Sequence, residues 1–341
     1  MVAKIFQSTM RAFYVMIILL VLASCQDKKL VSIDLGSVSK THIKGETLGN
    51  IGLQNPRKIF FLNGTIALFD NASTDGFLWF IDPENGELIK RFGVEGRGPK
   101  EFLNPNIFQH ENSVLIQTID GRTFLLDTSC TPKEILTKDK STIRVGCNYI
   151  GLFTDSTFVV SSPSTEDRIN FVNINASKQY NKYPFKVPQN LQMLKETIFD
   201  ASYDISDSRQ NLVVANRYYP ILEIIDFKTL ETEVFQIIDN GIKNSYNIQN
   251  GVAYFNNPVL KYTKCFAGKK GIYCLYHNAT EEEAMETLPE IHLISYDGQL
   301  MKRYALDYII YDFTLSEDEN VIYALGMSRE FLPEIRVYDL S

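Results

Sequence analysis

The sequence lacks several features that would place it in a familiar functional class. It has only 4 His and 1 Trp, no His-Glu-x-x-His zinc motif and no Gly-x-Ser-x-Gly elbow. It also lacks a basic excess, because 41 acidic residues against 34 Lys and Arg give a net charge of −7. A nucleic-acid binder needs a basic face to displace counterions, so no nucleic-acid partner is expected.

Long apolar runs are missing as well, although apolar residues are abundant. Hydrophobic residues make up 45% of the 341 residues and aromatic residues 12%, mainly 22 Phe and 18 Tyr. This composition is typical of a globular protein, and the many aromatic residues favour β structure. We therefore expect one large β domain or two average ones.

The first 25 residues have the pattern of an export signal. Lys4 and Arg11 precede an apolar run over 13–22, about half the roughly 20 residues that a membrane-spanning helix needs. Leu22-Ala-Ser-Cys25 then resembles the lipobox of bacterial lipoproteins, in which the cysteine is acylated and becomes the new N-terminus. The alternative is an ordinary secretory signal cleaved after Ser24. With a lipobox, the protein would contact the membrane only through its lipid.

A unit of strands recurs through the rest of the chain. Its clearest part is an apolar strand that ends in Asp or Asn, at Asp82, Asp127, Asn175, Asp226, Asp297 and Asp339. Successive copies lie 42 to 51 residues apart, except for one interval of 71. A polar turn and another apolar strand precede each copy, which indicates a hairpin. The sequence therefore predicts six repeats of a four-stranded unit.

Four strands in about 40 to 50 residues are typical of a propeller blade. The fold class is thus expected to be all-β, a six-bladed β-propeller with four antiparallel strands per blade. The sixth copy ends at Ser341 after its third strand, so the N-terminal segment must supply the strand that closes the last blade. The candidates are the segments 30–35 and 41–44. A multi-domain β-sandwich or a β-solenoid are the alternatives, but sandwiches do not repeat every four strands.

A glycine-rich stretch after the first repeat resembles a known family. Arg91 to Phe102, Arg-Phe-Gly-Val-Glu-Gly-Arg-Gly-Pro-Lys-Glu-Phe, is similar to the F-G-x-x-G-x-G-P-G-E-F stretch of the TolB-like six-bladed propeller lipoproteins of Bacteroidetes, a group related in shape to NHL-repeat propellers. Lys100 stands where that pattern favours Gly. The resemblance covers about residues 22–341, including Asn55-Pro56-Arg57, and implies a propeller lipoprotein of the outer membrane with no catalytic signature.

Together these patterns predict three parts. Residues 1–24 form a lipoprotein signal peptide, residues 25–50 a lipidated tether with the closing strand, and residues 51–341 the six-bladed propeller. The leaflet to which the lipid attaches stays open.

The glycines of this stretch do not fit a phosphate-binding loop. Gly93, Gly96 and Gly98 are followed by neither Gly-Lys-Ser/Thr nor a βαβ pattern. We instead expect a crossover between blades in which glycine allows positive φ and in which Glu101 and Phe102 fix the chain.

Four cysteines remain beyond the lipobox. Cys265 and Cys274 are placed symmetrically about the 268–271 turn and should face each other, either as a cross-strand disulfide or as two buried thiols. The pairing of Cys130 and Cys147 cannot be judged, and none of the four has zinc-ligand spacing.

Loop lengths indicate which end of the propeller binds a ligand. The loops that join the second strand of a blade to the third, and each blade to the next, all lie at one end, here called the long-loop face. The long insertions fall at 93–105, 161–169, 183–202, 239–258 and 277–290. Loops on a rigid scaffold usually carry binding sites, so the ligand is expected on this face. Within the last insertion, Thr280 and Glu283 form a capping box that predicts a short helix before Pro289.

Arginine and aromatic residues on the long-loop face are the candidate ligand contacts. They are Arg97, Arg168, Arg217, Tyr218, Tyr219, Arg329 and Phe331. Such side chains bind carboxylates, stack on sugars or anchor a protein partner. The alternative is that each Arg pairs with a neighbouring acid such as Glu166, Asp167 or Glu330, and that Tyr219-Pro220 is only a packed turn.

The sequence favours a non-catalytic binding module of the cell envelope without a cofactor. Its partner would be an envelope protein, a peptide or a glycan. The alternative is a hydrolase or lyase that holds Ca or Zn at the mouth of the central channel. Its candidate ligands would be Asn55, Asn104, Asn106 and Asp204.

Overall fold

A computed structural model gives the fold. It describes residues 31–341 except 50, 99–100, 137–148, 155–156, 162–168, 174–177, 183–199, 207, 209, 240, 242, 250–251, 256 and 329–331. The chain divides into two compact units, residues 1–31 and residues 32–341. No helix among the described residues is long and apolar enough to cross a membrane. Cys25, Arg168, Arg329, Phe331 and Cys147 lie outside the described residues.

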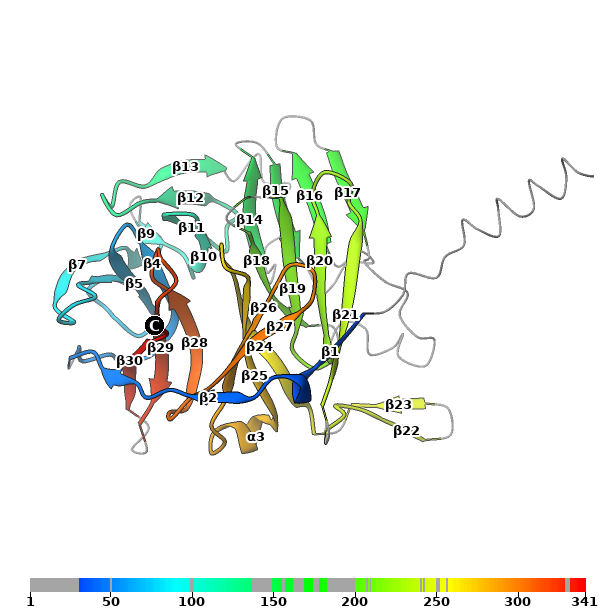
Figure 1. Ribbon diagram of the computed structural model, residues 1–341. Coiled ribbons are helices and arrows are strands. Elements are labelled where there is room, and N and C mark those ends of the chain that lie inside the picture. The colour runs from blue at the N-terminus through cyan, green and yellow to red at the C-terminus, as the bar shows by residue number, and fades with distance from the viewer. Residues whose placement is uncertain are drawn as a thin grey trace, which may run out of the picture. The chain divides into compact units, whose positions relative to one another are not determined.

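Six antiparallel blades make up the body, five with four consecutive strands and the last with three consecutive strands and one from the N-terminal segment (Figure 1). Blade 1 contains β4 (Pro56–Leu62), β5 (Thr65–Asp70), β6 (Leu78–Ile81) and β7 (Leu88–Phe92). Blade 2 contains β10 (Asn106–His110), β11 (Ser113–Gln117), β12 (Thr123–Leu126) and β13 (Lys133–Leu136). Blade 3 contains β14 (Tyr149–Thr154), β15 (Thr157–Ser161), β16 (Ile169–Asn173) and β17 (Lys178–Lys182).

The second half of the chain repeats this arrangement. Blade 4 contains β18 (Ala201–Ile205), β19 (Asn211–Asn216), β20 (Ile221–Asp226) and β21 (Thr232–Ile238). Blade 5 contains β24 (Val259–Ala267), β25 (Ile272–Thr280), β26 (Glu290–Ile294) and β27 (Leu300–Ala305). Blade 6 contains β28 (Ile310–Leu315), β29 (Val321–Met327) and β30 (Pro333–Asp339). The predicted six-bladed propeller is thereby confirmed.

In blades 1, 2 and 4, the Asp that marks the repeat closes the turn into the fourth strand. The Oδ1 atoms of Asp82, Asp127 and Asp226 accept the backbone N–H groups of Glu84, Ser129 and Lys228 at 2.8, 2.9 and 2.8 Å. Asp supports such turns because its carboxylate bonds to the backbone two residues ahead. In these three blades, the Asp that recurs in the sequence makes the same hydrogen bond in the same turn.

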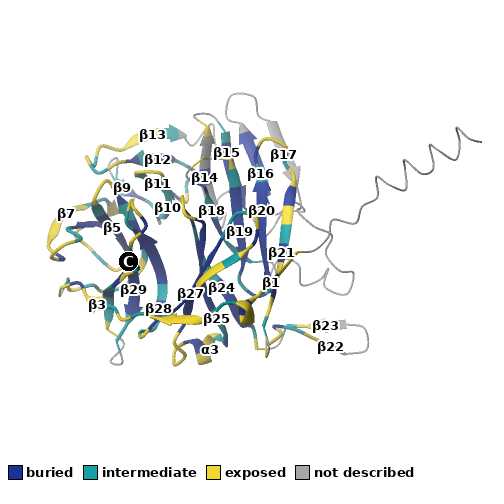
Figure 2. Ribbon diagram, in the orientation of Figure 1, coloured by how far each residue is buried: buried dark blue, intermediate teal, exposed yellow. Residues whose placement is uncertain are grey.

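Neighbouring blades bury each other's faces. Trp79 and Leu68 of blade 1 share a buried cluster with Leu325 and Ile335 of blade 6, and similar clusters join the other neighbours. In Figure 2 the middle strands of the blades, such as β19 and β20, are coloured mainly as buried, while positions on the outer strand β7 are exposed. The continuous apolar strands follow from this two-sided burial.

The last blade is closed by the N-terminal segment, as expected, but through a different strand. The closing strand is β3 (Glu46–Thr47), which pairs antiparallel with β30. The candidate segments 30–35 and 41–44 instead contribute β1 (Val31–Asp34) to the edge of blade 4 and β2 (Lys40–His42), parallel to β27, to the edge of blade 5. Only the part nearest Pro56 is close enough to blade 1 to complete blade 6.

Residues 32–47, which we call the N-terminal belt, thus cross the outer strands of three blades (Figure 1). A short 3₁₀ turn, η1 (Leu35–Ser37), joins β1 to β2 and buries Leu35 completely. The Lys40 Nζ atom lies 2.6 Å from Glu290 Oε1, and the Arg303 guanidinium donates to the Leu35 carbonyl. The belt is therefore held by apolar burial and by ion pairs.

The glycine-rich stretch forms the predicted crossover between blades 1 and 2. Its short strands β8 (Val94–Glu95) and β9 (Glu101–Phe102) pair in parallel, and Gly93 has φ +76°. The Glu101 carboxylate accepts the Gly98 N–H at 2.6 Å, and a Cβ on Gly96 would lie 2.1 Å from Glu101 Oε2. The glycines thus leave room for the Glu101 side chain.

Two further elements decorate the loops of blades 4 and 5. The hairpin β22 (Asn247–Gln249) and β23 (Val252–Tyr254) lies between β21 and β24. The predicted helix is α3 (Glu281–Ala284), only four residues long, and its capping box between Thr280 and Glu283 is confirmed.

Candidate functional site

Alternating strand direction places the loops at the expected ends. Each innermost strand starts at the long-loop face, and its first hairpin turn lies at the opposite end, here called the hairpin face. The β22–β23 hairpin and α3 both belong to loops of the long-loop face. Most of the predicted insertions at 161–169 and 183–202 lie outside the described residues.

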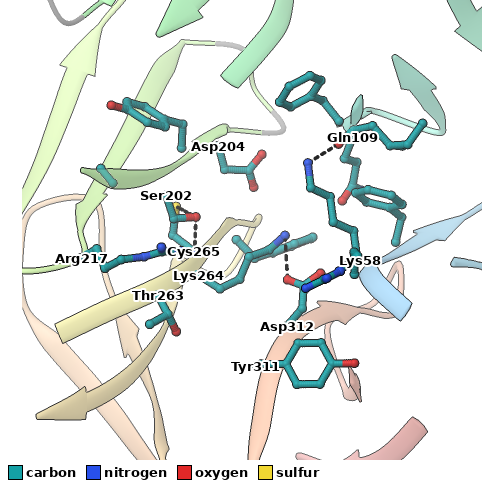
Figure 3. Close-up of a pocket in the computed structure, with 17 residues that line it drawn as sticks. Lys58, Gln109, Ser202, Asp204, Arg217, Thr263, Lys264, Cys265, Tyr311 and Asp312 are labelled. Carbon is teal, nitrogen blue, oxygen red and sulfur yellow. Dashed lines mark hydrogen bonds and ion pairs between the residues drawn. The ribbon is translucent and has the colours of Figure 1, made fainter. Parts of the chain in front are cut away.

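A cavity of about 240 Å³ occupies the long-loop end of the propeller axis (Figure 3). Its lining comes mainly from the innermost strands of five blades. The lining residues are Arg57, Lys58, Phe60, Ile107, Phe108, Gln109, Ala201, Ser202, Tyr203, Asp204, Arg217, Thr263, Lys264, Cys265, Phe266, Tyr311 and Asp312. This position, under the long loops, makes the cavity the candidate binding site.

A second cavity of about 440 Å³ lies at the hairpin face. The turns that follow the innermost strands line it, with Glu111, Ser206, Lys269 and Glu317 among them. Both cavities share Gln109, Asp204 and Phe266, so they adjoin along the axis.

Charged side chains of the first cavity tie neighbouring blades together. The Lys264 Nζ atom of blade 5 lies 3.0 Å from Asp312 Oδ1 of blade 6, and Asp312 Oδ2 accepts the Ile59 N–H of blade 1 at 2.9 Å. Asp204 Oδ2 of blade 4 accepts the Ala267 N–H of blade 5 at 2.7 Å. These contacts fix the positions of the carboxylates that line the cavity.

The two lysines of the cavity differ in their partners. Burial disfavours the charged form of Lys264, but the adjacent Asp312 carboxylate outweighs it and raises the Lys264 pKa. The Lys58 Nζ atom donates to Asn106 Oδ1 at 3.2 Å and lies 4.4 Å from the centre of the Phe108 ring. In Figure 3, Lys58 and Lys264 enter the same cavity from two blades.

The two arginines of the cavity have hydrogen-bonding capacity left. Arg57 is exposed, and among the described residues its guanidinium has no ion pair or hydrogen bond. Arg217 Nη1 lies 3.4 Å from Asp200 Oδ2, whereas its Nε atom is buried and has no partner within the described part of the chain. Both guanidinium groups can therefore donate a hydrogen bond to a further acceptor.

A half-buried histidine, His277, lies within reach of the positive charge of Arg217. His277 Nε2 is 3.0 Å from Oγ1 of Thr263, which lines the cavity. Burial, together with the positive charge of Arg217, lowers the His277 pKa to about 4. His277 is thus neutral at pH 7.

The residues predicted as ligand contacts on the long-loop face do not all line the cavity. Arg217 lines the cavity. Arg97 is exposed on the crossover, away from the cavity lining. Arg168, Arg329 and Phe331 lie outside the described residues.

The two tyrosines form packing contacts. The buried Tyr218 packs against Phe255 and donates its OH to Glu281 Oε1 at 2.9 Å. Tyr219 stacks on Tyr246 with 6.3 Å between ring centroids. Tyr218 therefore links the segment that follows β19 to α3. Neither tyrosine lines the cavity.

The residues named for a metal site have other contacts. Of Asn55, Asn104, Asn106 and Asp204, only Asp204 lines either axial cavity, and the Asn106 amide oxygen is occupied by Lys58. Within the described ranges, no group of three or more His, Cys, Asp or Glu side chains is arranged to hold a metal ion.

The predicted register of the blade 5 hairpin is confirmed. Cys265 and Cys274 pair directly across β24 and β25, and both are buried free thiols in this structure. Burial raises the pKa of Cys265 to about 12 and raises the pKa of Cys274 well above its ordinary value. Cys130 is also a free thiol, in a turn at φ +61°.

Sequence reasoning did not select Arg57, Lys58, Lys264 and Asp312 as site residues. Their signal is a charged residue inside an otherwise apolar first strand of a blade, as in Pro56–Leu62 and Val259–Ala267. The signal is not sufficient by itself, because the buried Lys261 of the latter strand bonds to the Lys243 carbonyl and to Asn278 and does not line the cavity.

Fold and site define the chain as a six-bladed β-propeller with an axial cavity. The sequence matches the TolB-like 6-blade propeller-like family over residues 37–318, and the chain belongs to that family. No curated protein matches it.

Solved structures similar to this chain share its fold at low sequence identity. A Bacteroides fragilis protein assigned as exported has 11% identity and a TM-score of 0.57, covering 91% of this chain and 99% of that one. A member of the DUF4221 family from Bacteroides vulgatus has 11% identity and a TM-score of 0.54, covering 89% and 97%. The U3-55K structure has 9% identity and a TM-score of 0.51, covering 87% and 98%.

Proposed function

We propose that this protein is a non-catalytic binding module of the bacterial cell envelope that holds its ligand in the axial cavity at the long-loop face. The supporting observation is the cavity itself, a concave site on a rigid ring with two guanidinium groups that have unused donors. Ligand sites are usually preformed concavities with a few placed polar groups.

Anchoring by a lipid at Cys25 is part of the same proposal. The lipobox-like sequence supports it, and so does the likeness to a Bacteroides protein assigned as exported. Cys25→Ala should remove the acylation site and release the protein from the membrane fraction. Lipid labelling that persists in this variant would contradict the anchor.

Capture from envelope extract tests the binding function. The ligand, an envelope protein, peptide or glycan, would be recovered on the immobilised, detergent-solubilised chain and identified by mass spectrometry. Arg217→Glu should abolish recovery because it reverses a charge in the cavity. Lys228→Glu is the matched control, since Lys228 is exposed on the β20–β21 turn at the hairpin face. Equal recovery with both variants would contradict the proposal.

A further inference from the structure

We propose that the axial cavity binds a single acidic sugar unit, with its carboxylate held between Arg57 and Arg217. This inference rests on the proposed function, because it names the ligand class of the same site.

The charge of the cavity differs from that of the whole protein. The chain carries a net charge of −7, yet four basic side chains, Arg57, Lys58, Arg217 and Lys264, outnumber the carboxylates of Asp204 and Asp312 in the lining. A concave site lined by one sign of charge concentrates the opposite ion. The excess of basic over acidic side chains in this cavity favours an anionic ligand.

The two arginines are the members of this set that can bind it. Lys264 is paired with Asp312, and Lys58 is bonded to Asn106 and the Ile107 carbonyl. Arg57 is exposed without an ion pair among the described residues. Arg217 Nη1 lies 3.4 Å from Asp200 Oδ2, but the Arg217 side chain is 41% exposed and its Nε–H has no acceptor among these residues. A guanidinium matches the fork of a carboxylate better than an ammonium group does.

The remaining lining favours a sugar ring over the end of a peptide. Besides the cations, the cavity presents acceptor oxygens from Asp204, Asp312 and Gln109 and the partly buried rings of Phe266 and Tyr311. The oxygens of Asp204 and Asp312 already have protein partners. Each such oxygen has two lone pairs and can accept a second hydrogen bond, so ring hydroxyls can donate to it, whereas an apolar side chain offers no donor. The volume of about 240 Å³ lies below the roughly 300–1,000 Å³ of most ligand sites and suits one sugar unit.

Calorimetric titration of the detergent-solubilised full-length chain tests this assignment. D-glucuronate should bind saturably and at least tenfold more tightly than D-glucose, which has the same ring without the carboxylate. Arg57→Gln and Arg217→Gln should each weaken glucuronate binding at least tenfold. Lys228→Gln should not change it. The melting temperature of each variant shows whether it folds. If Arg217→Gln impairs folding, Arg57→Gln still tests the inference, because Arg57 is exposed and its replacement should not disturb the fold.

Three results would overturn the inference. They are equal binding of glucose and glucuronate, glucuronate binding that neither arginine variant weakens, and no glucuronate binding at all. Binding of N-acetylalanine but not of glucuronate would assign the cavity to a peptide terminus and also refute it. If glucuronate does not bind while Arg217→Glu still abolishes capture from envelope extract, the inference is wrong and the proposed function is still supported. If capture is also insensitive to that variant, both fail.

Discussion

Asp312 of the last blade accepts the Ile59 N–H of the first blade at 2.9 Å and lies 3.0 Å from the Lys264 ammonium. One carboxylate thus joins three blades at the point where the ring closes. Asp312→Asn should destabilise the fold by about 3 kcal/mol, because it leaves the positive charge of Lys264 uncompensated in a largely buried position. Urea unfolding measures this. The exposed Asp75→Asn should cost about 0.5 kcal/mol or less, and equal losses would contradict the account.

The N-terminal belt should contribute directly to stability. Leu35 is completely buried in the cluster that joins blades 4 and 5, so Leu35→Ala should lower the free energy of unfolding by about 2–5 kcal/mol. Lys44→Ala, on an exposed belt position, should leave it nearly unchanged. A negligible effect of Leu35→Ala would show that the belt is not part of the cooperative fold.

The crossover offers a coupled pair of variants. Gly96→Ala places a methyl group where the Glu101 carboxylate lies, so it should displace that side chain and break the bond to the Gly98 N–H. The cost should be about 1–2 kcal/mol. In a Glu101→Ala background the same change should cost much less. Additive losses in this double-mutant cycle would refute the contact as the reason for the glycine.

The sequence predicted the parts of the fold that local chemistry determines. The Asp turns of blades 1, 2 and 4, the Thr280–Glu283 capping box and the register of Cys265 against Cys274 all depend on neighbours along the chain. The number of blades could be predicted because the strand that ends in Asp or Asn recurs six times, at intervals of 42 to 51 residues with one of 71.

The pairing of the belt and the composition of the site could not be predicted in the same way. Three outer strands, β21, β27 and β30, offer equivalent open edges, and the sequence does not indicate which edge each belt segment takes. Lys264 and Asp312 come from different blades, and their contact depends on how the strands are staggered around the axis. The position of Arg217 at the long-loop face could be predicted because the residue directly follows a second strand, and this needs no knowledge of how the strands are staggered.

Stability should fall on mild acidification through His277. Its native pKa of about 4 lies below the ordinary value of 6.5, so between these values the unfolded chain binds a proton that the native state does not. Stability is therefore lost as the pH falls from 6.5 toward 4. From pH 7 to pH 5, His277→Gln should lose about 1–2 kcal/mol less than the unaltered protein. The buried His292, whose pKa burial also lowers, is present in both proteins and does not affect the difference. Unfolding titrations at the two pH values measure it, and identical losses would contradict the assignment.

The central claim is that the ligand occupies the axial cavity at the long-loop face. The most direct test is a high-resolution crystal structure of the protein purified from its native membrane together with its ligand. The account predicts ligand density in the cavity, in contact with the Arg57 and Arg217 guanidinium groups. Ligand density confined to the hairpin-face cavity beside Lys269 and Glu317, or to the outer edges of the blades, would contradict it.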